Sequence, residues 1–199
     1  MDLDEEGDCI SLEDLMRTHV YRKVVAELDQ VVVKYRFVED SDIANLHYFQ
    51  AVIKAVLRLH PAVPLLVPRP TNEACQIQGY NVSKHCIVYV NVWGMGRDPK
   101  VWDNPLEFKP ERFIGSSIDV LGQNYNLLPL GAGRRYCAGM LLGHRMVHLY
   151  VASLLHAFER DFPREVLKDS SEIGGIALKK TLRLVGTAKP RLAESLYRK

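Results

Sequence analysis

The chain has 199 residues, of which 47% are hydrophobic and 25% are charged, and its formal net charge is +2. This composition is typical of a globular domain with a sizeable core, and it excludes the disordered and fibrous classes. The near-neutral charge balance gives no argument for nucleic acid as a partner. Because no run of about eighteen apolar residues occurs, we expect no membrane span in this chain.

The first ten residues are acidic, which excludes a signal or transit peptide, and we expect residues 1–10 to be disordered. The cysteines form no Cys-x-x-Cys pair, and this predicts reduced thiols in an intracellular setting. Two of them, Cys75 and Cys86, fall in or beside predicted strands, and we expect both to be buried as small apolar side chains.

Apolar residues at helical spacing predict three helices. The first extends from a Ser11–Asp14 capping box to about residue 32. The second covers residues 48–59 and ends at His60-Pro61, because the residue before a proline is disfavoured in a helix. The third covers residues 138–158. A short helix or turn is expected at residues 41–43.

Strand signals are confined to short segments. Four prolines between residues 61 and 70 favour an extended edge segment. Residues 73–79 and 87–92 are predicted to be two strands joined by a polar turn near Ser83-Lys84, and residues 176–185 are a further candidate strand pair. The predicted fold class is α+β, mainly α, with helices segregated from a small antiparallel sheet.

The stretch from Pro129 to Gly139 contains three glycines, two adjacent arginines and Cys137, and it leads directly into the third predicted helix. Unpaired amides at a helix start and neighbouring guanidinium groups favour an anionic thiolate. Three interpretations follow: a phosphate cradle, a structural cysteine, or an axial haem ligand. The phosphate cradle is disfavoured because Tyr136 stands where a dinucleotide-binding turn needs its third glycine.

This loop resembles the haem-binding signature of the cytochrome P-450 family, matched by Gly133, Arg135, Cys137 and Gly139. Leu130 departs from the family's phenylalanine. Further ordered matches extend the resemblance, to the C-terminal part of a plant microsomal cytochrome P-450, from about Val20 to Leu192. They are Lys54–Pro61, Val67–Arg69, Asn91–Trp93, Arg97–Pro99, Phe108–Phe113 and Pro190–Leu192.

The resemblance implies that residues 11–199 are the C-terminal, haem-binding part of such a fold, with a cysteine loop leading into a long helix. It implies haem b (iron protoporphyrin IX) as the cofactor and Cys137 as the axial ligand of its iron. Arg135 and Arg69 are expected to bind the propionates, with Gly133 and Gly139 shaping the loop. The apolar residues expected to line the substrate cavity are Ala62, Val63, Leu65 and Ile176.

For a complete family member, the resemblance implies insertion of one oxygen atom from O2 into a small apolar molecule of plant secondary metabolism. Electrons would come from an NADPH-cytochrome reductase, at the cytosolic face of the endoplasmic reticulum membrane. This chain alone would be cytosolic or peripheral. The family's acid–threonine element is not found in the sequence, so no catalytic residue is assigned. The alternative is a truncated, non-catalytic remnant with weak or no haem binding.

A second departure concerns the buried charges behind the haem loop. The family's glutamate three residues before Arg58 is Ala55 here. In the family this glutamate joins two arginines, matched by Arg58 and Arg112, in an ion cluster. We expect Arg58 to be half-buried and to need another partner, for which Glu111 is a candidate.

Two histidines of the third predicted helix are a candidate metal site. His144 and His148 stand at zinc-ligand spacing, but Arg145 follows His144 where a catalytic glutamate belongs. A structural role is therefore expected for both histidines.

Overall fold

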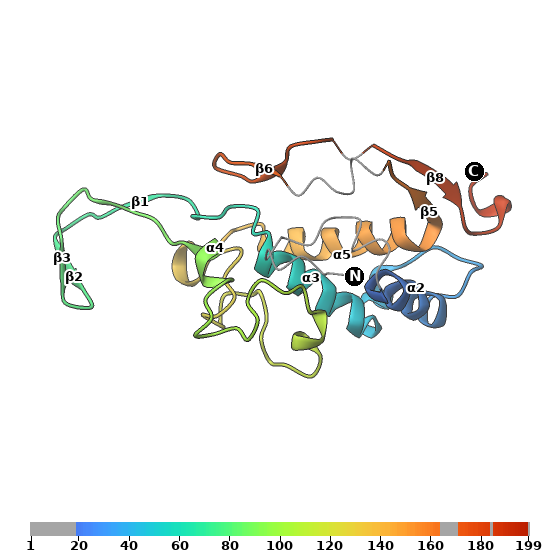
Figure 1. The fold of residues 1–199 in the computed structure, drawn as a ribbon, viewed down its shortest axis with the longest axis horizontal. Coiled ribbons are helices and arrows are strands. Elements are labelled where there is room, and N and C mark those ends of the chain that lie inside the picture. The colour runs from blue at the N-terminus through green and yellow to red at the C-terminus, as the bar shows by residue number, and fades with distance from the viewer. Residues whose placement is uncertain (1–18, 164–170, 184, 199) are drawn as a thin grey trace, which may run out of the picture.

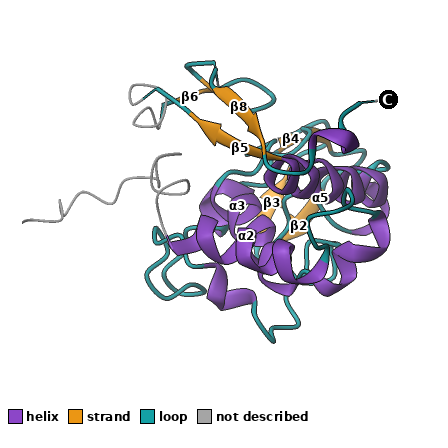
Figure 2. Cartoon of the chain, turned by 90° about the vertical axis from the view of Figure 1, so that its right-hand side faces the viewer, coloured by secondary structure: helices purple, strands orange, loops and turns teal. Residues whose placement is uncertain are grey.

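The computed structural model of the chain describes residues 19–163, 171–183 and 185–198. The expected disorder of residues 1–10 and the Ser11–Asp14 capping box lie outside the described residues. Three helices form the body of the molecule: α2 (His19–Val31), α3 (His47–Leu59) and α5 (Met140–Ala157). They pack against one another in the views of Figures 1 and 2. Within the described residues, no helix is long and apolar enough to span a membrane.

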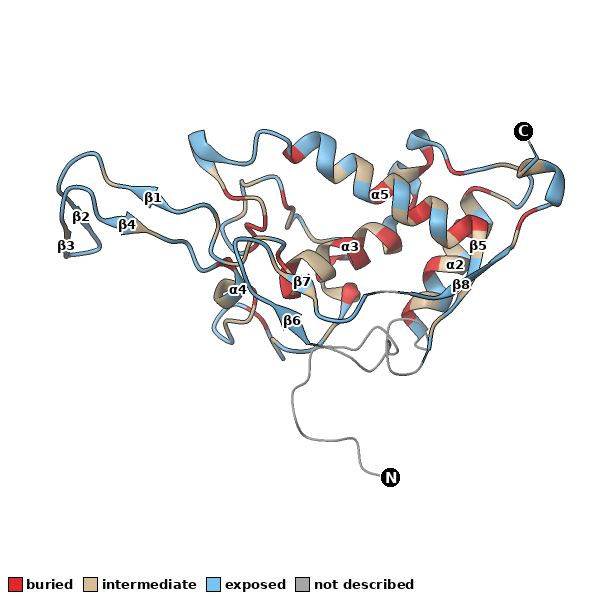
Figure 3. Ribbon diagram, turned by 90° about the horizontal axis from the view of Figure 1, so that it is seen from above, coloured by how far each residue is buried: buried red, intermediate tan, exposed pale blue. Residues whose placement is uncertain are grey.

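The core lies where these helices face each other (Figure 3). Helix α2 buries Val20, Val24 and Leu28, which repeat every four residues and so form one apolar face. These side chains join residues of α3 and Ala152 of α5 in one cluster of buried side chains. Helix α3 also contributes Ala51 and Ala55 to a second cluster, formed with Trp102, Phe113, Val120 and Leu127. Helix α3 therefore belongs to both halves of the core.

Helix α3 begins one residue before its predicted start and ends at its predicted residue, Leu59. His60 leaves the helical region, at φ −125° and ψ 65°, as the following proline requires. At the other end the Glu27 carboxylate accepts hydrogen bonds from the Tyr48 and Phe49 amides, at 2.8 and 2.9 Å. A carboxylate at a helix N-terminus satisfies unpaired donors and complements the helix dipole.

The predicted strand pairing between residues 73–79 and 87–92 is wrong. Strand β2 (Cys75–Ile77) pairs instead with β3 (Tyr80–Val82), and β1 (Arg69–Pro70) pairs with β4 (Ile87–Val88). The two-residue turn between β2 and β3 consists of Gln78 and Gly79, whose φ angles are +46° and +86°. Two positive φ angles suit a tight hairpin, so the chain reverses here and not at Ser83-Lys84.

The four strands extend from the helical body as one exposed arm (Figures 1 and 3). Cys75 and Cys86 lie on this arm, and both are exposed, so the prediction that they are buried is also wrong.

The C-terminal strands also differ from the prediction. Helix α5 gives way directly to β5 (Phe158–Asp161), which pairs antiparallel with β8 (Thr187–Pro190). A separate pair joins β6 (Glu172–Ile173) to β7 (Lys179–Lys180). The remaining short elements are α4 (Val92–Met95) and the 3-10 turns η1 (Asp40–Asn45), η2 (Pro110–Phe113), η3 (Gly133–Arg135) and η4 (Glu194–Leu196). The predicted short helix or turn at residues 41–43 is part of η1.

An ion pair between Arg36 and Asp42 fixes η1 beside the core. The Arg36 guanidinium donates two hydrogen bonds to the Asp42 carboxylate, at 2.7 and 2.8 Å, and Asp42 is 8% exposed. The hydrogen bonds from Arg36 hold the pKa of Asp42 below its usual value. The native carboxyl group therefore loses its proton at lower pH than the unfolded one, and it stabilises the fold above the unfolded pKa, about 3.9.

We accordingly expect Asp42→Asn to lower the free energy of unfolding at pH 7 by about 1.5 kcal/mol. This value is the low end of the range for hydrogen bonds to charged groups, and we choose it because Arg36 is partly exposed. The difference from wild type should shrink as the pH falls through the folded pKa of Asp42, where the native protein loses this contribution. Urea unfolding at pH 7 and at a series of acidic pH values measures it. A difference that stays constant over the series would contradict the ion-pair explanation.

Candidate functional site

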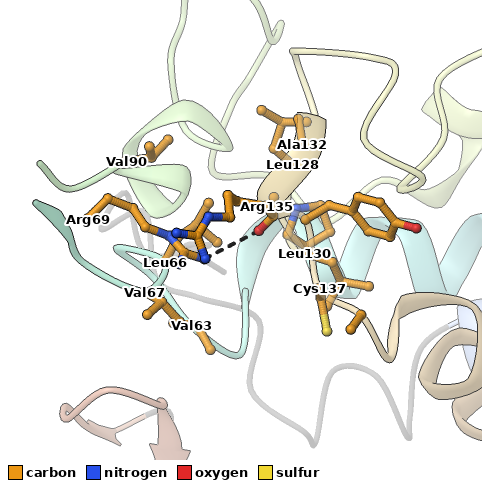
Figure 4. Close-up of a pocket in the computed structure, with 14 residues that line it drawn as sticks. Val63, Leu66, Val67, Arg69, Val90, Leu128, Leu130, Ala132, Arg135 and Cys137 are labelled. Carbon is orange, nitrogen blue, oxygen red and sulfur yellow. Dashed lines mark hydrogen bonds between the residues drawn. The ribbon is translucent and has the colours of Figure 1, made fainter. Parts of the chain in front are cut away.

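A cavity of about 490 Å³ lies between the glycine-rich loop and the segment that leads into β1. Its wall consists of residues between 63 and 69, of Val90, and of residues between 128 and 138 (Figure 4). The Val90 amide donates to the Leu65 carbonyl at 3.2 Å, which holds the strand segments together on this side. Cavities of this size are typical of small-molecule and cofactor sites.

The glycine-rich loop is a series of tight turns that ends at Cys137. Gly131 and Gly133 have φ angles of +78° and +65°, which glycine adopts without the steric cost of a side chain. The Cys137 amide donates to the Leu130 carbonyl at 3.0 Å, and the Cys137 carbonyl accepts from the Met140 amide at 3.0 Å as α5 begins. These bonds fix the backbone on both sides of Cys137, and its thiol is free and exposed.

Two arginines lie on the same wall of the cavity. Arg69 is the first residue of β1, and its Nη2 donates to the Arg135 carbonyl at 3.3 Å, as the dashed line in Figure 4 marks. The Arg135 guanidinium also lines the cavity. Planar guanidinium groups bind carboxylates with paired hydrogen bonds. The structure thus brings Arg69 beside Arg135 and Cys137, although Arg69 and Arg135 are 66 residues apart in sequence. One thiol and two carboxylate-binding groups lie around the same cavity.

These residues fit a haem group. A thiol can ligate haem iron as thiolate, two guanidinium groups match two propionates, and valine and leucine side chains cover much of the remaining wall. Gly139 lies near the sulfur, since a Cβ atom built there would be in ordinary van der Waals contact with Cys137 Sγ, at 4.0 Å. Leu130, the departure from the family's loop, is itself part of the cavity wall.

Comparison with known proteins gives the same assignment. The family model described as Cytochrome P450 matches residues 12–185. The chain belongs to the cytochrome P450 family. It is 50% identical to cytochrome P450 76A2 of Solanum melongena over 83% of this chain and 33% of that protein. It is 47% identical to the iridoid oxidase of Catharanthus roseus, over 88% of this chain and 36% of the relative. This chain spans about a third of the length of these relatives.

The solved structures include a zebra fish cytochrome P450 with abiraterone, which superposes on this chain with a TM-score of 0.78. The two sequences are 34% identical, and the match covers 90% of this chain and 42% of the other. The α+β layout with a cysteine loop before a long helix is therefore that of part of a cytochrome P450 fold. Membership of the family implies haem as the cofactor.

Of the four residues expected to line the substrate cavity of this cytochrome P450 chain, Val63 lies on the wall of the cavity. Ala62, Leu65 and Ile176 are outside that wall, and Ile176 is 75% exposed. The Leu178 amide donates to the Ala62 carbonyl at 2.9 Å. This bond brings the segment that contains Ile176 close to the residues that follow the C-terminal end of α3. Their contact with substrate remains a prediction. Sequence reasoning missed Leu66 and Val90, which line the cavity because β1 pairs with β4.

Arg58 is 1% exposed, and so more deeply buried than expected. Its guanidinium donates to the carbonyls of Gly96, Pro105 and Glu107, at 2.6, 2.5 and 2.8 Å. Glu111, the expected partner, instead accepts from Lys23 Nζ at 2.8 Å and from the Tyr48 hydroxyl at 3.2 Å. Backbone carbonyls therefore take the place of the carboxylate that was expected to partner Arg58.

The histidine pair on α5 has a packing role. His148 is 1% exposed; its Nδ1 lies 2.7 Å from the His144 carbonyl, and its ring meets Phe49 edge-on at 5.6 Å between centroids. Burial lowers the pKa of both imidazoles, that of His144 to about 4, so both are neutral at physiological pH. In the described parts of the chain, no group of three or more His, Cys, Asp or Glu side chains could hold a metal ion.

Proposed function

We propose that this chain binds haem b through Cys137 and forms the proximal part of a haem-thiolate monooxygenase. The observation that supports the proposal is the placement of a free thiol and two guanidinium groups around one cavity of about 490 Å³. A thiolate ligand donates electron density to haem iron and so favours cleavage of bound dioxygen, which is the chemistry the cofactor supplies.

Each residue of the site has a distinct role in this proposal. Cys137 ligates the iron from a loop whose backbone is fixed by the hydrogen bonds to Leu130 and Met140. Arg69 and Arg135 bind the propionates and orient the ring against the loop. Gly133 permits the turn before Cys137, and Gly139 directly precedes the first residue of α5.

For the substrate we propose a small apolar molecule of plant secondary metabolism. Relatives support this class by name, among them the iridoid oxidase of Catharanthus roseus and a flavonoid 3′,5′-hydroxylase of Campanula medium. The apolar side chains of Val63, Leu66 and Val90 are compatible with such a substrate. We further propose an NADPH-cytochrome reductase as electron donor and the cytosolic face of the endoplasmic reticulum membrane as the location of the complete protein.

The carbon monoxide difference spectrum tests haem-thiolate ligation directly. The purified chain is mixed with haemin, freed of excess cofactor, reduced and exposed to carbon monoxide. We expect stoichiometric haem uptake and the shifted Soret band of a thiolate ligand. Haem uptake without this band would overturn ligation by Cys137.

A second candidate is a non-catalytic chain that binds haem weakly or not at all. The feature that favours it is Ala55, which leaves Arg58 without a carboxylate partner on the preceding turn of α3. Absence of haem uptake in the same titration would support this candidate and contradict the first.

A further inference from the structure

Two hydrogen bonds attach the β6–β7 hairpin to the segment that follows α3. The Nδ1 atom of His60, the C-terminal cap of α3, lies 2.7 Å from a carboxylate oxygen of Glu172, the first residue of β6. An ionised carboxylate can only accept, so the imidazole donates this bond. The second bond runs from the Leu178 amide, just before β7, to the Ala62 carbonyl. The hairpin is therefore attached at two points to residues 60–62.

The position of the hairpin depends on these attachments. It lies on the outside of the helical body (Figure 1), and neither of its strands contains a buried residue. A Cβ atom built on Gly174 would meet nothing within 4 Å, so the turn has no close packing around it either. A two-stranded hairpin without a buried face has little stability of its own.

The contact between His60 and Glu172 is better shielded than the hairpin around it. Their side chains are 30% and 28% exposed, whereas Ile173 beside Glu172 is 46% exposed and Ile176 in the turn is 75% exposed. A carboxylate–imidazole bond in such a place is stronger than a fully exposed pair, because it is less screened by water. This bond is the side-chain contribution to holding the hairpin.

The attachment lies at the rim of the cavity at Cys137. Ala62, which accepts from Leu178, is followed directly by Val63, a residue of the cavity wall. Ile176 is two residues before Leu178 and outside the wall itself. An exposed aliphatic side chain at this place can contact a ligand that extends beyond Val63.

We propose that Glu172 is a positioning residue for the cavity. Through its hydrogen bond to His60 it holds the β6–β7 hairpin at the rim, so that Ile176 adds apolar surface for a ligand bound beside Val63. The ligand part rests on the function proposed above, in which the substrate is a small apolar molecule. The attachment itself requires no haem.

Amide hydrogen exchange in the haem-free chain tests the attachment. The Leu178 amide is the reporter, because its exchange requires the hairpin to separate from Ala62. We expect Glu172→Ala to speed this exchange about twofold to fivefold, the range for a partly exposed pair. In a His60→Ala background the same substitution should have no further effect, because the partner is already absent. An equal effect in both backgrounds would overturn the proposal.

Two variants serve as controls for the exchange experiment. Glu172→Gln keeps the length of the side chain and an oxygen that can accept from His60, so it should stay close to wild type. Glu194→Ala removes a carboxylate that pairs with Arg198 at the surface, and it should leave the Leu178 amide unchanged. Faster exchange in Glu194→Ala, to the same degree as in Glu172→Ala, would mean that any lost ion pair loosens the chain, and this would contradict a specific attachment.

Naphthalene binding to the haem-loaded chain tests the ligand contact. Ile176→Ala should raise the dissociation constant about fourfold to fifteenfold, as expected for one or two methylene groups that lose contact with the ligand. Glu172→Ala should also raise it, but should add nothing once residue 176 is alanine. The haem spectrum should be the same in all variants. A full effect of Glu172→Ala without Ile176, or no effect of Ile176→Ala, would contradict the positioning role.

Failure of this proposal can be distinguished from failure of the proposed function. A chain that takes up no haem contradicts the function proposed above, while the exchange cycle, measured without haem, still decides whether Glu172 and His60 hold the hairpin. A chain that binds haem but shows no coupling between the two residues contradicts the attachment alone.

Discussion

Replacing Cys137 with alanine is expected to abolish the thiolate-type Soret band of the reduced, carbon monoxide-bound protein. The substitution removes the sulfur and leaves the loop backbone intact, because the amide and carbonyl of residue 137 make the structural hydrogen bonds. The thiol is exposed, so its loss creates no buried cavity, and we expect the Tm of the haem-free protein to change by less than about 1 °C. Any haem that remains bound should have the spectrum of a haem without a sulfur ligand.

The other described cysteines provide matched controls for this prediction. Cys75 and Cys86 are also exposed free thiols, but they lie on the β1–β4 arm and outside the cavity. The variants Cys75→Ala and Cys86→Ala should retain the haem spectrum of wild type. A thiolate-type band that survives in Cys137→Ala and disappears in either control would assign the ligand to another cysteine.

A folded chain that binds haem also allows the roles of the two arginines to be separated from that of the thiol. Arg69 and Arg135 act on the propionates in the proposal, so their loss should weaken haem retention without changing the ligand to iron. The spectrum and the affinity therefore report on different residues of one cavity. This distinction follows from the structure, in which the guanidinium groups and the thiol are separate parts of the wall (Figure 4).

The helical body and the glycine-rich loop could be predicted because their signals are local. In α3, apolar spacing defines the buried face, and His60-Pro61 predicts the observed last residue, Leu59. The glycine-rich loop is similarly contained in eleven consecutive residues, where glycines specify the turns. In both cases the residues that determine the structure are neighbours in sequence.

The pairing of the strands could not be predicted, because neither periodicity nor the obvious turn residues determine it. The hairpin of β2 and β3 reverses at Gln78, a residue that rarely adopts positive φ, and the more polar Ser83-Lys84 pair misled the prediction. Strand β5 contains Glu159, Arg160 and Asp161 in succession and therefore lacks the alternation of a half-buried strand. Its pairing with β8 is a tertiary contact between segments far apart in sequence.

The partners of buried charges were also beyond the sequence. Glu111 is one residue before Arg112 in sequence, yet it bonds to Lys23, 88 residues away. Arg58 finds its acceptors in the irregular segment between residues 96 and 107, whose carbonyls have no sequence signature. A backbone carbonyl can be supplied by any residue, so only the folded chain shows which ones converge on a guanidinium.

This convergence makes Arg58 the side chain whose truncation should destabilise the fold most. Arg58→Ala leaves the carbonyls of Gly96, Pro105 and Glu107 without their charged donor and removes the guanidinium 5.2 Å from the centroid of the Trp102 ring. With about 1–3 kcal/mol for each stranded buried group, partly relieved by water, we expect a loss of about 3–5 kcal/mol. That is a large share of the 5–15 kcal/mol typical of a domain.

Urea unfolding of Arg58→Ala, Arg58→Lys and Arg198→Ala measures this effect against two controls. Arg58→Lys retains a charge but presents one nitrogen where the guanidinium presents two to the carbonyls, so its loss should be intermediate. Arg198 pairs with Glu194 at the surface, where both side chains are 77% exposed, and Arg198→Ala should change stability by less than about 0.5 kcal/mol. If Arg58→Ala unfolds at the same urea concentration as Arg198→Ala, the three carbonyl contacts do not stabilise the irregular segment, and its conformation must depend on the packing of Trp102 and Phe113 instead.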